Sequence, residues 1–170
     1  MILRLSQKLA RKTRVSQLAE LSLDENPFAD WSYHVFNVGR TQFLIVTNTR
    51  SLYSCLLPGA GITNGDVLIE RSVSAIREFL EHDQQPLALN KLAVVSASSP
   101  HFAKALSRSV TGSMNDLIFG AKLLLGDGVD RLEAASRLNE TPLSALSTAD
   151  GRNYANPREV FAEFMSEQQP

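Results

Sequence analysis

The feature that most constrains the fold of this 170-residue chain is a run of alternating apolar and polar residues from 31 to 57. Such alternation places every second side chain on the same face of a β-strand. Short polar breaks indicate hairpin turns within the run. They divide it into three predicted strands, at residues 32–38, 41–47 and 51–57. Because apolar residues fall on both faces of the middle strand, we expect 41–47 to lie at the centre of an antiparallel sheet.

The rest of the chain predicts helices and further strands around this sheet. Two short apolar segments read as strands, at residues 2–5 and 91–96. Helices are expected at residues 6–21 (with a weak point at Thr13-Arg14), 64–82 and 100–167. Capping patterns mark expected helix starts at residues 99–100, 113–116, 141–142 and 156–159. The sequence therefore predicts one α+β domain over residues 1–170, an antiparallel sheet with an N-terminal helix and a helical C-terminal half packed on it.

Composition excludes several classes of protein. Hydrophobic residues make up 44% of the chain and charged residues 21%, values typical of a globular domain rather than a disordered or coiled-coil protein. The single cysteine, Cys55, rules out an intrachain disulfide and a multi-cysteine metal site. The first residues lack the apolar core of a signal peptide, and no apolar run is long enough to span a membrane. We therefore expect a cytoplasmic protein that makes no membrane contact.

The net charge of −1 argues against a generally basic nucleic-acid binder, but the charges are unevenly distributed. Basic residues dominate segments 1–20, 31–60 and 86–125, whereas acidic residues dominate 61–85 and the chain from Asp127 onward. Segregated charges can fold into one positive face that attracts an anionic partner. They can also be exposed helix faces that simply differ in sign, which is the commoner case. The sequence leaves both interpretations open.

The strongest candidate site is the stretch RSVTGSMND, which begins at Arg108. We expect it to open an amphipathic helix, where unpaired backbone N–H groups favour a phosphate or carboxylate. Gly112 would let a ligand approach the backbone, while Arg108 would supply a bidentate guanidinium and Ser113 a hydroxyl. Capping alone also explains Ser113 and Asp116. It does not explain Arg108 or Asn115, which lies outside the apolar stripe of the helix.

A second candidate is formed by polar side chains at the predicted hairpin turns, Arg40, Asn48 and Arg50. Guanidinium and amide groups carried on a rigid sheet are well placed to contact a ligand. The same residue types are ordinary in turns, so a purely structural role is the alternative.

An acidic loop precedes the first predicted strand of the sheet. Asp24, Glu25, Asn26 and Asp30 carry oxygen ligands for Mg²⁺ or Ca²⁺, but their spacing is not that of a calcium-binding loop and is more typical of a solvated turn. The sequence also lacks the patterns of zinc sites, nucleophile elbows, dinucleotide fingerprints and phosphate-binding loops. We therefore expect no cofactor and no metal site.

Four segments carry a resemblance to known sequences, namely MILRLSQKL at 1–9, DENPFADW at 24–31, TNTRSLYS at 47–54 and RSVTGSMND at 108–116. Through them the chain resembles a family of small bacterial proteins known only as a conserved domain of unknown function. The resemblance spans nearly the whole chain. It implies a bacterial protein and brings no activity with it.

Two functions remain open from the sequence. The first is a non-enzymatic module that binds an anionic partner, nucleic acid or a phosphorylated ligand, through Arg108, Ser113 and the backbone after Gly112, assisted by Arg40, Arg50 and the basic first helix. The alternative is a small hydrolase or transferase with an Asp-centred site, which requires Asp116 or the acidic loop to lie in a concave pocket. The sequence does not fix the number of subunits.

Overall fold

The alternating run forms three antiparallel strands in the computed structural model, which describes residues 1–166 of the chain. They are β2 (Asp30–Val38), β3 (Thr41–Asn48) and β4 (Ser54–Pro58). The last strand begins three residues later than expected, because residues 49–53 form a turn around Asn48. The side-chain Oδ1 of Asn48 accepts hydrogen bonds from the backbone N–H of Arg50 (3.3 Å) and of Ser51 (3.0 Å).

Two parallel strands complete the sheet. β1 (Ile2–Leu5) lies between β2 and β5 (His101–Lys104) and pairs in parallel with both, which gives the strand order β4-β3-β2-β1-β5. The sheet is therefore mixed: the expected antiparallel pairing is confirmed for β2, β3 and β4, whereas β1 and β5 pair in parallel. A parallel pair needs a long crossover between its strands, and the helices before β5 supply it.

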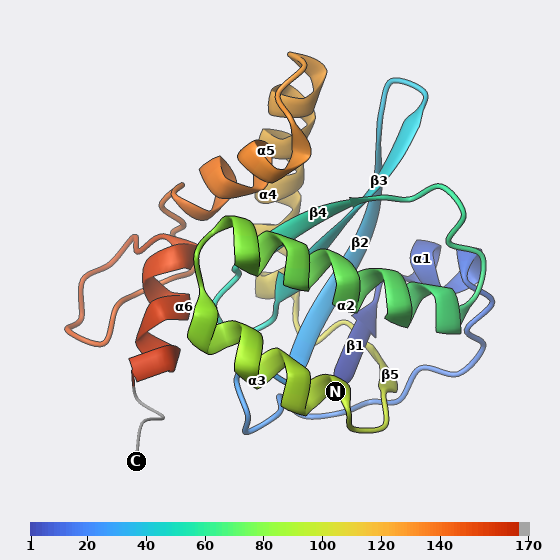
Figure 1. Ribbon diagram of the computed structural model, residues 1–170, viewed down its shortest axis with the longest axis horizontal. Coiled ribbons are helices and arrows are strands. Elements are labelled where there is room, and N and C mark those ends of the chain that lie inside the picture. The colour runs from blue at the N-terminus through green and yellow to red at the C-terminus, as the bar shows by residue number, and fades with distance from the viewer. Residues whose placement is uncertain (167–170) are drawn as a thin grey trace.

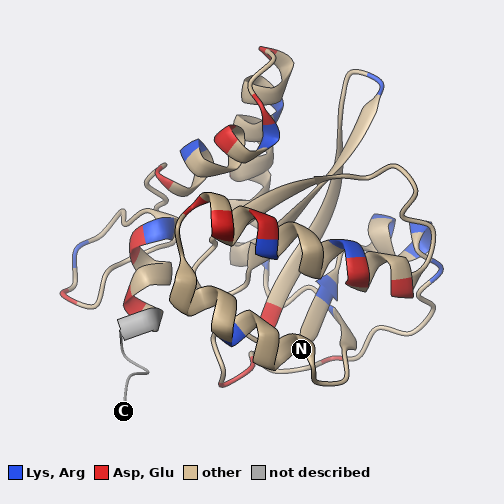
Figure 2. Cartoon of the chain, in the orientation of Figure 1, with Lys and Arg blue, Asp and Glu red and all other residues tan. Residues whose placement is uncertain are grey.

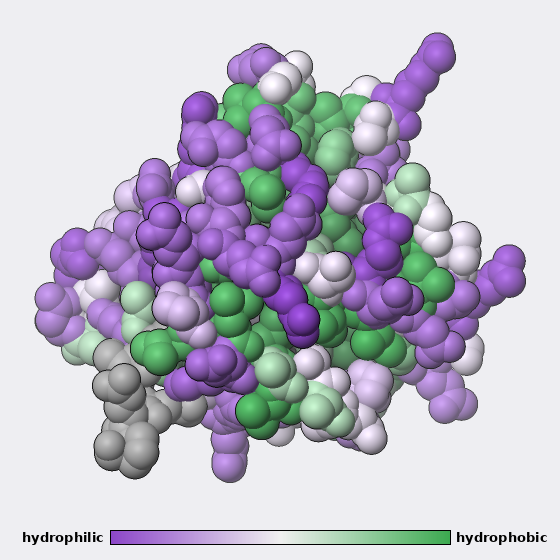
Figure 3. Space-filling view, viewed as in Figure 1, coloured by the Kyte–Doolittle hydropathy of each residue, from purple (hydrophilic) through white to green (hydrophobic). Residues whose placement is uncertain are grey.

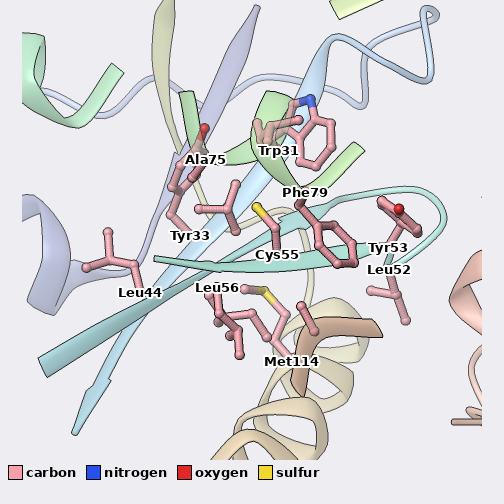
Figure 4. Packing of buried hydrophobic residues seen from close by; sticks show 14 of the residues in the cluster. Trp31, Tyr33, Leu44, Leu52, Tyr53, Cys55, Leu56, Ala75, Phe79 and Met114 are labelled. Atoms are coloured by element: carbon pink, nitrogen blue, oxygen red, sulfur yellow. The ribbon is translucent and has the colours of Figure 1, made fainter. Parts of the chain in front are cut away.

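Helices cover both faces of the sheet (Figure 1). Their bounds are α1 (Gln7–Lys12), α2 (Gly65–His82), α3 (Pro86–Ser96), α4 (Arg108–Gly126), α5 (Arg131–Asn139) and α6 (Pro157–Ser166). In Figure 4 the side chain of Cys55 points towards Tyr33 on the side of α2, whereas that of Leu56 points towards Met114 of α4. Alternate residues of β4 thus enter two hydrophobic layers, one beneath α2 and α3 and the other beneath α4 and α5.

Two predictions between residues 91 and 108 are wrong. The segment 91–96, expected as a strand, belongs to helix α3, which has Pro86 in its first turn and buries Ala88, Leu92 and Val95. A short apolar run does not by itself distinguish a strand from a buried helix. Conversely, residues 101–104 form strand β5 rather than a helix, because their backbone pairs with β1.

The helical C-terminal half is confirmed, with changes in where its helices begin. Asn156 and Glu159 form the expected capping box of α6, each side chain accepting a hydrogen bond from the other residue's N–H (2.9 and 3.2 Å). No helix starts at residues 141–142; α5 starts earlier, where Asp130 accepts from the N–H of Leu132 (2.9 Å). Residue 167 of the expected range lies outside the described residues.

The first helix is much shorter than the expected 6–21. It ends at Lys12, and the chain then runs irregularly along the free edge of β5. There the N–H of Ala19 donates to the carbonyl of Phe102 (3.0 Å) and the N–H of Lys104 donates to the carbonyl of Ala19 (2.9 Å). These bonds satisfy backbone groups of an edge strand that would otherwise be unpaired. They stabilise the extended conformation of this segment over a longer first helix.

A buried ion pair joins the two strands at the centre of this arrangement. Arg4 of β1 and Asp30 of β2 are 2% and 1% exposed, and Nε and Nη2 of Arg4 both donate to the carboxylate at 2.7 Å. Figure 2 shows the basic segment of β1 beside the acidic one of β2. The remaining Arg4 donors bind the carbonyls of Leu21, Ser22 and Lys104. All five N–H groups of the guanidinium are thus used.

Among the described residues, no helix combines the length and the apolar character that crossing a membrane requires.

We expect Arg4→Met to lower the free energy of unfolding by about 3–5 kcal/mol, because it leaves the Asp30 carboxylate buried without its partner. Urea denaturation measures the loss. Arg4→Met/Asp30→Leu should recover part of it, since the double variant buries no charge. As a control, Arg137→Ala removes the exposed pair with Glu133 (2.8 Å) and should cost about 0.5 kcal/mol. If Arg4→Met lowers the free energy of unfolding by less than Arg137→Ala does, the structural role given to the Arg4–Asp30 pair is wrong.

Candidate functional site

β1 and β5 end side by side at one edge of the sheet, and β2 passes beside them and continues to Val38. β1, β2 and β5 run in the same direction, and α1 and α4 begin directly after β1 and β5. From β1 the chain leads to β2 on one side, while β5 lies on the other side. A change of direction of this kind in a parallel sheet is where ligand sites most often form.

An open hollow lies beside α1 at this edge. It has a volume of about 720 Å³, and we call it the α1 hollow. Its polar lining comes from both ends of α1, the segment after it and the end of β5, namely Gln7, Arg11, Arg14, Ser16, Gln17 and Lys104. Three of these six side chains are basic and none is acidic.

Two smaller hollows continue from it between α1 and α4. The inner hollow, of about 210 Å³, shares Gln7 with the α1 hollow and is walled on the α4 side by Val110, Thr111 and Met114. The β2 hollow, of about 330 Å³, lies further along β2, and its lining includes Lys8, Asn115 and Lys122. His34 of β2 lines both of these smaller hollows. The α1 and inner hollows share one lining residue, as do the inner and β2 hollows, so the three lie next to one another on this surface.

The electrostatics of this surface are one-sided. Arg11, Arg14 and Lys104 line the α1 hollow, Lys8 and Lys122 line the β2 hollow, and no Asp or Glu lines either. Lys104 pairs with the exposed Glu20 (2.5 Å). Within the part of the chain that the structure describes, the other four basic residues form no ion pair. Figure 2 shows the basic residues on α1. Four clustered cations that have no carboxylate partner favour an anion.

Arg14 holds an unusual backbone conformation at this surface. Its φ of +56° lies in the left-handed region, which glycine occupies at low cost and other residues seldom adopt. The N–H of Arg14 donates to Arg11 O (3.3 Å) and that of Val15 to Ala10 O (3.0 Å), the Schellman pattern that glycine usually completes. At the end of α4, Gly128 takes this role with a φ of +83°. Folding alone would therefore favour glycine at position 14, and a conformationally strained residue often marks a functional site.

His34 is the titratable group at the centre of the surface. Burial and, to a smaller extent, the charge of Lys8 lower the pKa of the imidazole below its ordinary 6.5. The ring is therefore neutral at neutral pH. A neutral imidazole offers one hydrogen-bond donor and one acceptor. Because it carries no charge, it does not attract an anion as the neighbouring lysines and arginines do.

The stretch that begins at Arg108 borders this surface, but not as the sequence predicts. Helix α4 starts at Arg108, and its N-cap is Ser107, whose Oγ accepts from the N–H of Val110 (3.2 Å). The predictions of a turn at Gly112 and a cap at Ser113 are wrong, because both residues lie inside the helix, and Ser113 is buried. The backbone N–H groups after Gly112 consequently do not form a helix terminus.

Of the residues in this stretch that the sequence analysis proposes as ligand contacts, one lines a hollow described above. Asn115 contributes to the β2 hollow, whereas Arg108 and Asp116 are exposed and line none of the three. Arg108 and Asn115 nevertheless lie on the same side of α4, because seven residues are close to two turns, or about 10.5 Å along the axis. Arg108 therefore borders the surface from the start of the helix.

The hairpin candidates do not join this site. Arg40 is exposed in the turn between β2 and β3, and Arg50 follows the opposite end of β3, about 26 Å away for eight extended residues. Arg50 Nη2 donates to the carbonyl of Asp24 (2.9 Å). Asn48 is fully buried, and its Nδ2 donates to the carbonyl of Pro27 (2.6 Å). Asn48 therefore has the structural role that was the alternative for these turns.

The acidic loop is also structural. Asp30 is held by Arg4, and the carboxylate of Asp24 accepts the N–H of Asn26 (2.9 Å). No group of three or more His, Cys, Asp or Glu residues among residues 1–166 is arranged to hold a metal ion.

A different kind of surface lies over α3. Leu87 and Val94 are 48% and 74% exposed, and Figure 3 shows hydrophobic atoms over the lower part of the face where α3 runs. The adjoining hollow of about 310 Å³ has Lys91 as its basic residue, and the ammonium of Lys91 lies 4.9 Å from the ring centre of Phe28. This surface is less suited to an anion than the one around α1.

Sequence reasoning missed His34 and the backbone of Arg14. It did identify the basic segments 1–20 and 86–125, and the structure brings residues of both together around α1. Arg40 and Arg50, the basic residues of the third segment, 31–60, line none of the three hollows. The weak point at Thr13-Arg14 in the expected first helix did indicate where α1 ends. No local sequence pattern predicts the hollow beside it.

Comparison with known families finds a match over nearly the whole chain. The model of a family described as a domain of unknown function (DUF6933) matches residues 2–160, which include every residue of the three hollows. No curated protein sequence matches the chain.

We expect Arg14→Gly to raise the free energy of unfolding by about 0.5–1 kcal/mol, because glycine adopts the left-handed conformation without the side-chain clash. Thermal or urea denaturation measures the gain. Gln84, which has a φ of +55° after α2, provides a matched control. Gln84→Gly should stabilise the protein to a similar extent while leaving the α1 hollow unchanged. Destabilisation by Arg14→Gly would show that its side chain contributes to folding.

We expect the protein to lose stability as the pH falls below 6.5, partly through His34. The lowered pKa means that the unfolded state takes up a proton before the folded state does, so the contribution of His34 is complete above pH 6.5 and declines towards the folded pKa. His34→Gln should flatten the dependence of the unfolding free energy on pH between 7 and 5. His101→Gln, at an exposed position, is the control. An NMR titration that places the His34 pKa above 6.5 would refute this account.

Proposed function

The chain belongs to the family described as a domain of unknown function (DUF6933), and because that membership brings no activity with it, we propose a function from the site alone. The protein is a non-enzymatic module that binds an anionic partner, nucleic acid or a phosphorylated ligand, at the carboxyl edge of its parallel strands. Arg11, Arg14 and Lys104 bind the anion in the α1 hollow. Lys8 and Lys122 extend the positive surface along β2.

The observation that carries this proposal is the set of five basic side chains from distant segments on one surface without a lining carboxylate. A guanidinium offers a planar pair of donors that matches a phosphate or carboxylate, so the two arginines supply both charge and geometry. The proposed cytoplasmic location accords with the single, buried and reduced cysteine.

The alternative, an Asp-centred hydrolase or transferase, has less support. It required Asp116 or the acidic loop in a concave pocket. Asp116 is exposed and lines none of the three hollows, and neither do Asp24, Glu25 or Asp30. Asp30, the buried acid nearest to the inner hollow, is fully engaged by Arg4. We therefore retain the binding module.

We expect Arg11→Gln/Arg14→Gln to weaken binding of inorganic pyrophosphate about tenfold at low salt, because the loss of two charge-assisted contacts exceeds 1 kcal/mol. Isothermal titration calorimetry measures the affinity. Glutamine is tolerated at left-handed positions of this chain, as Gln84 demonstrates. The double variant should therefore fold.

The matched control is Arg40→Gln/Arg50→Gln, which removes the same charge at two positions that line none of the three hollows. Equal weakening by both double variants would mean that pyrophosphate senses only the overall charge. Absence of binding at 50 mM salt, both of pyrophosphate and of the DNA described next, would overturn the proposal. A labelled single-stranded 12-nucleotide DNA measured in parallel shows whether a polyanion is preferred, and a steep decrease of its affinity with salt is expected in that case.

A further inference from the structure

The inner hollow differs in chemistry from the α1 hollow that it adjoins. Val110, Met114 and Ala105 give it an apolar wall. Arg4 also lines it, but all five N–H groups of this guanidinium are already bound to Asp30 and to three carbonyls. A phosphate in the inner hollow would therefore find no free cation there.

Most of the hydroxyl groups around the inner hollow are also occupied. Ser6 Oγ accepts the N–H of Leu9 (3.4 Å), Ser32 Oγ bonds Thr49 Oγ1 (2.8 Å), and Thr111 Oγ1 donates to the carbonyl of Ser107 (3.0 Å). Tyr33 also lines the hollow, but its side chain points to the α2 side of the sheet (Figure 4). The side chains with free hydrogen-bonding groups on the α4 side are those of Gln7 and His34, together with the hydroxyl hydrogen of Ser6. An apolar hollow with one or two convergent polar groups is typical of a small-molecule site.

The volume of the inner hollow sets the size of its occupant. About 210 Å³ corresponds to roughly seven water molecules at about 30 Å³ each, and an engineered apolar cavity of about 150 Å³ holds benzene. One six-membered ring therefore fits. Gln7 lines both hollows, so a single small molecule can place a ring in one and an anionic group in the other.

We propose that the anionic partner is a small phosphorylated molecule that carries a single ring, with its phosphate on Arg11 and Arg14 in the α1 hollow and its ring in the inner hollow between α1 and α4. This inference rests on the proposed anion-binding function. Gln7 lies at the junction, where its amide can bind the oxygen that links the ring to the phosphate. Nucleic acid fits less well, because no aromatic residue lines the α1 hollow to stack successive bases.

The experiment compares phenyl phosphate with inorganic phosphate by NMR titration of the full chain. The wild type should bind phenyl phosphate at least tenfold more tightly. Val110→Phe fills the inner hollow from α4 and should reduce phenyl phosphate to the affinity of inorganic phosphate, while changing the affinity of inorganic phosphate less than twofold. Ala105→Leu, at an exposed lining position, tests the same point if Val110→Phe does not fold. Arg11→Gln/Arg14→Gln should weaken both ligands.

The outcomes separate this inference from the function on which it rests. Equal affinities of the two phosphates in the wild type would overturn the ring site and leave the anion site standing. Failure of both phosphates to bind would overturn both. A single-stranded DNA that binds more tightly than phenyl phosphate, with an affinity that Val110→Phe does not change, would overturn the inference in favour of nucleic acid.

Discussion

The pairing of Arg4 with Asp30 is the contact on which the carboxyl edge of the sheet depends. One guanidinium joins β1 to β2 through the carboxylate, and holds the loop at residues 21–22 and the end of β5 through three carbonyls. Desolvating two charges is expensive, so this pair is tolerable only because every donor of Arg4 has an acceptor. The pair thereby fixes the positions of the segments from which the α1 and inner hollows are built.

The edges of the sheet are closed by side chains and loop rather than by further strands. On β4, Asn139 of α5 binds both backbone groups of Ser54 at 2.8 Å, as a neighbouring strand would. On β5, the backbone around Ala19 does the same. At the other end of the molecule, the ring of Tyr53 stacks on Phe161 with centroids 4.1 Å apart, and its hydroxyl donates to Asp83 (2.5 Å). These contacts attach α5 and α6 to the sheet and leave the carboxyl edge free for a ligand.

The sequence predicts the parts of this fold that local patterns determine. Alternation identified β2, β3 and β4 because hairpins pair neighbours in the chain, and helical periodicity identified α2 within the expected range 64–82. The sequence could not predict that residues 91–96 form a helix and residues 101–104 a strand. β5 buries only Ala103 of its four residues, and it is a strand because its backbone pairs with β1. For the site, the basic segments were visible, but their convergence depends on that same long-range pairing. Arg14 could not be singled out, since its position is one where glycine is expected.

The mixed pairing of β1 also bears on how the molecule assembles. β2, β3 and β4 are joined by short turns, and hairpins of this kind form in microseconds. β1 meets β5 only after the intervening chain of nearly one hundred residues has been folded back, and contacts of such sequence separation form slowly. We therefore expect the hollows between α1 and α4 to form late in folding. A ligand held there stabilises contacts absent from the early structure, so it acts on the rate of unfolding far more than on the rate of folding.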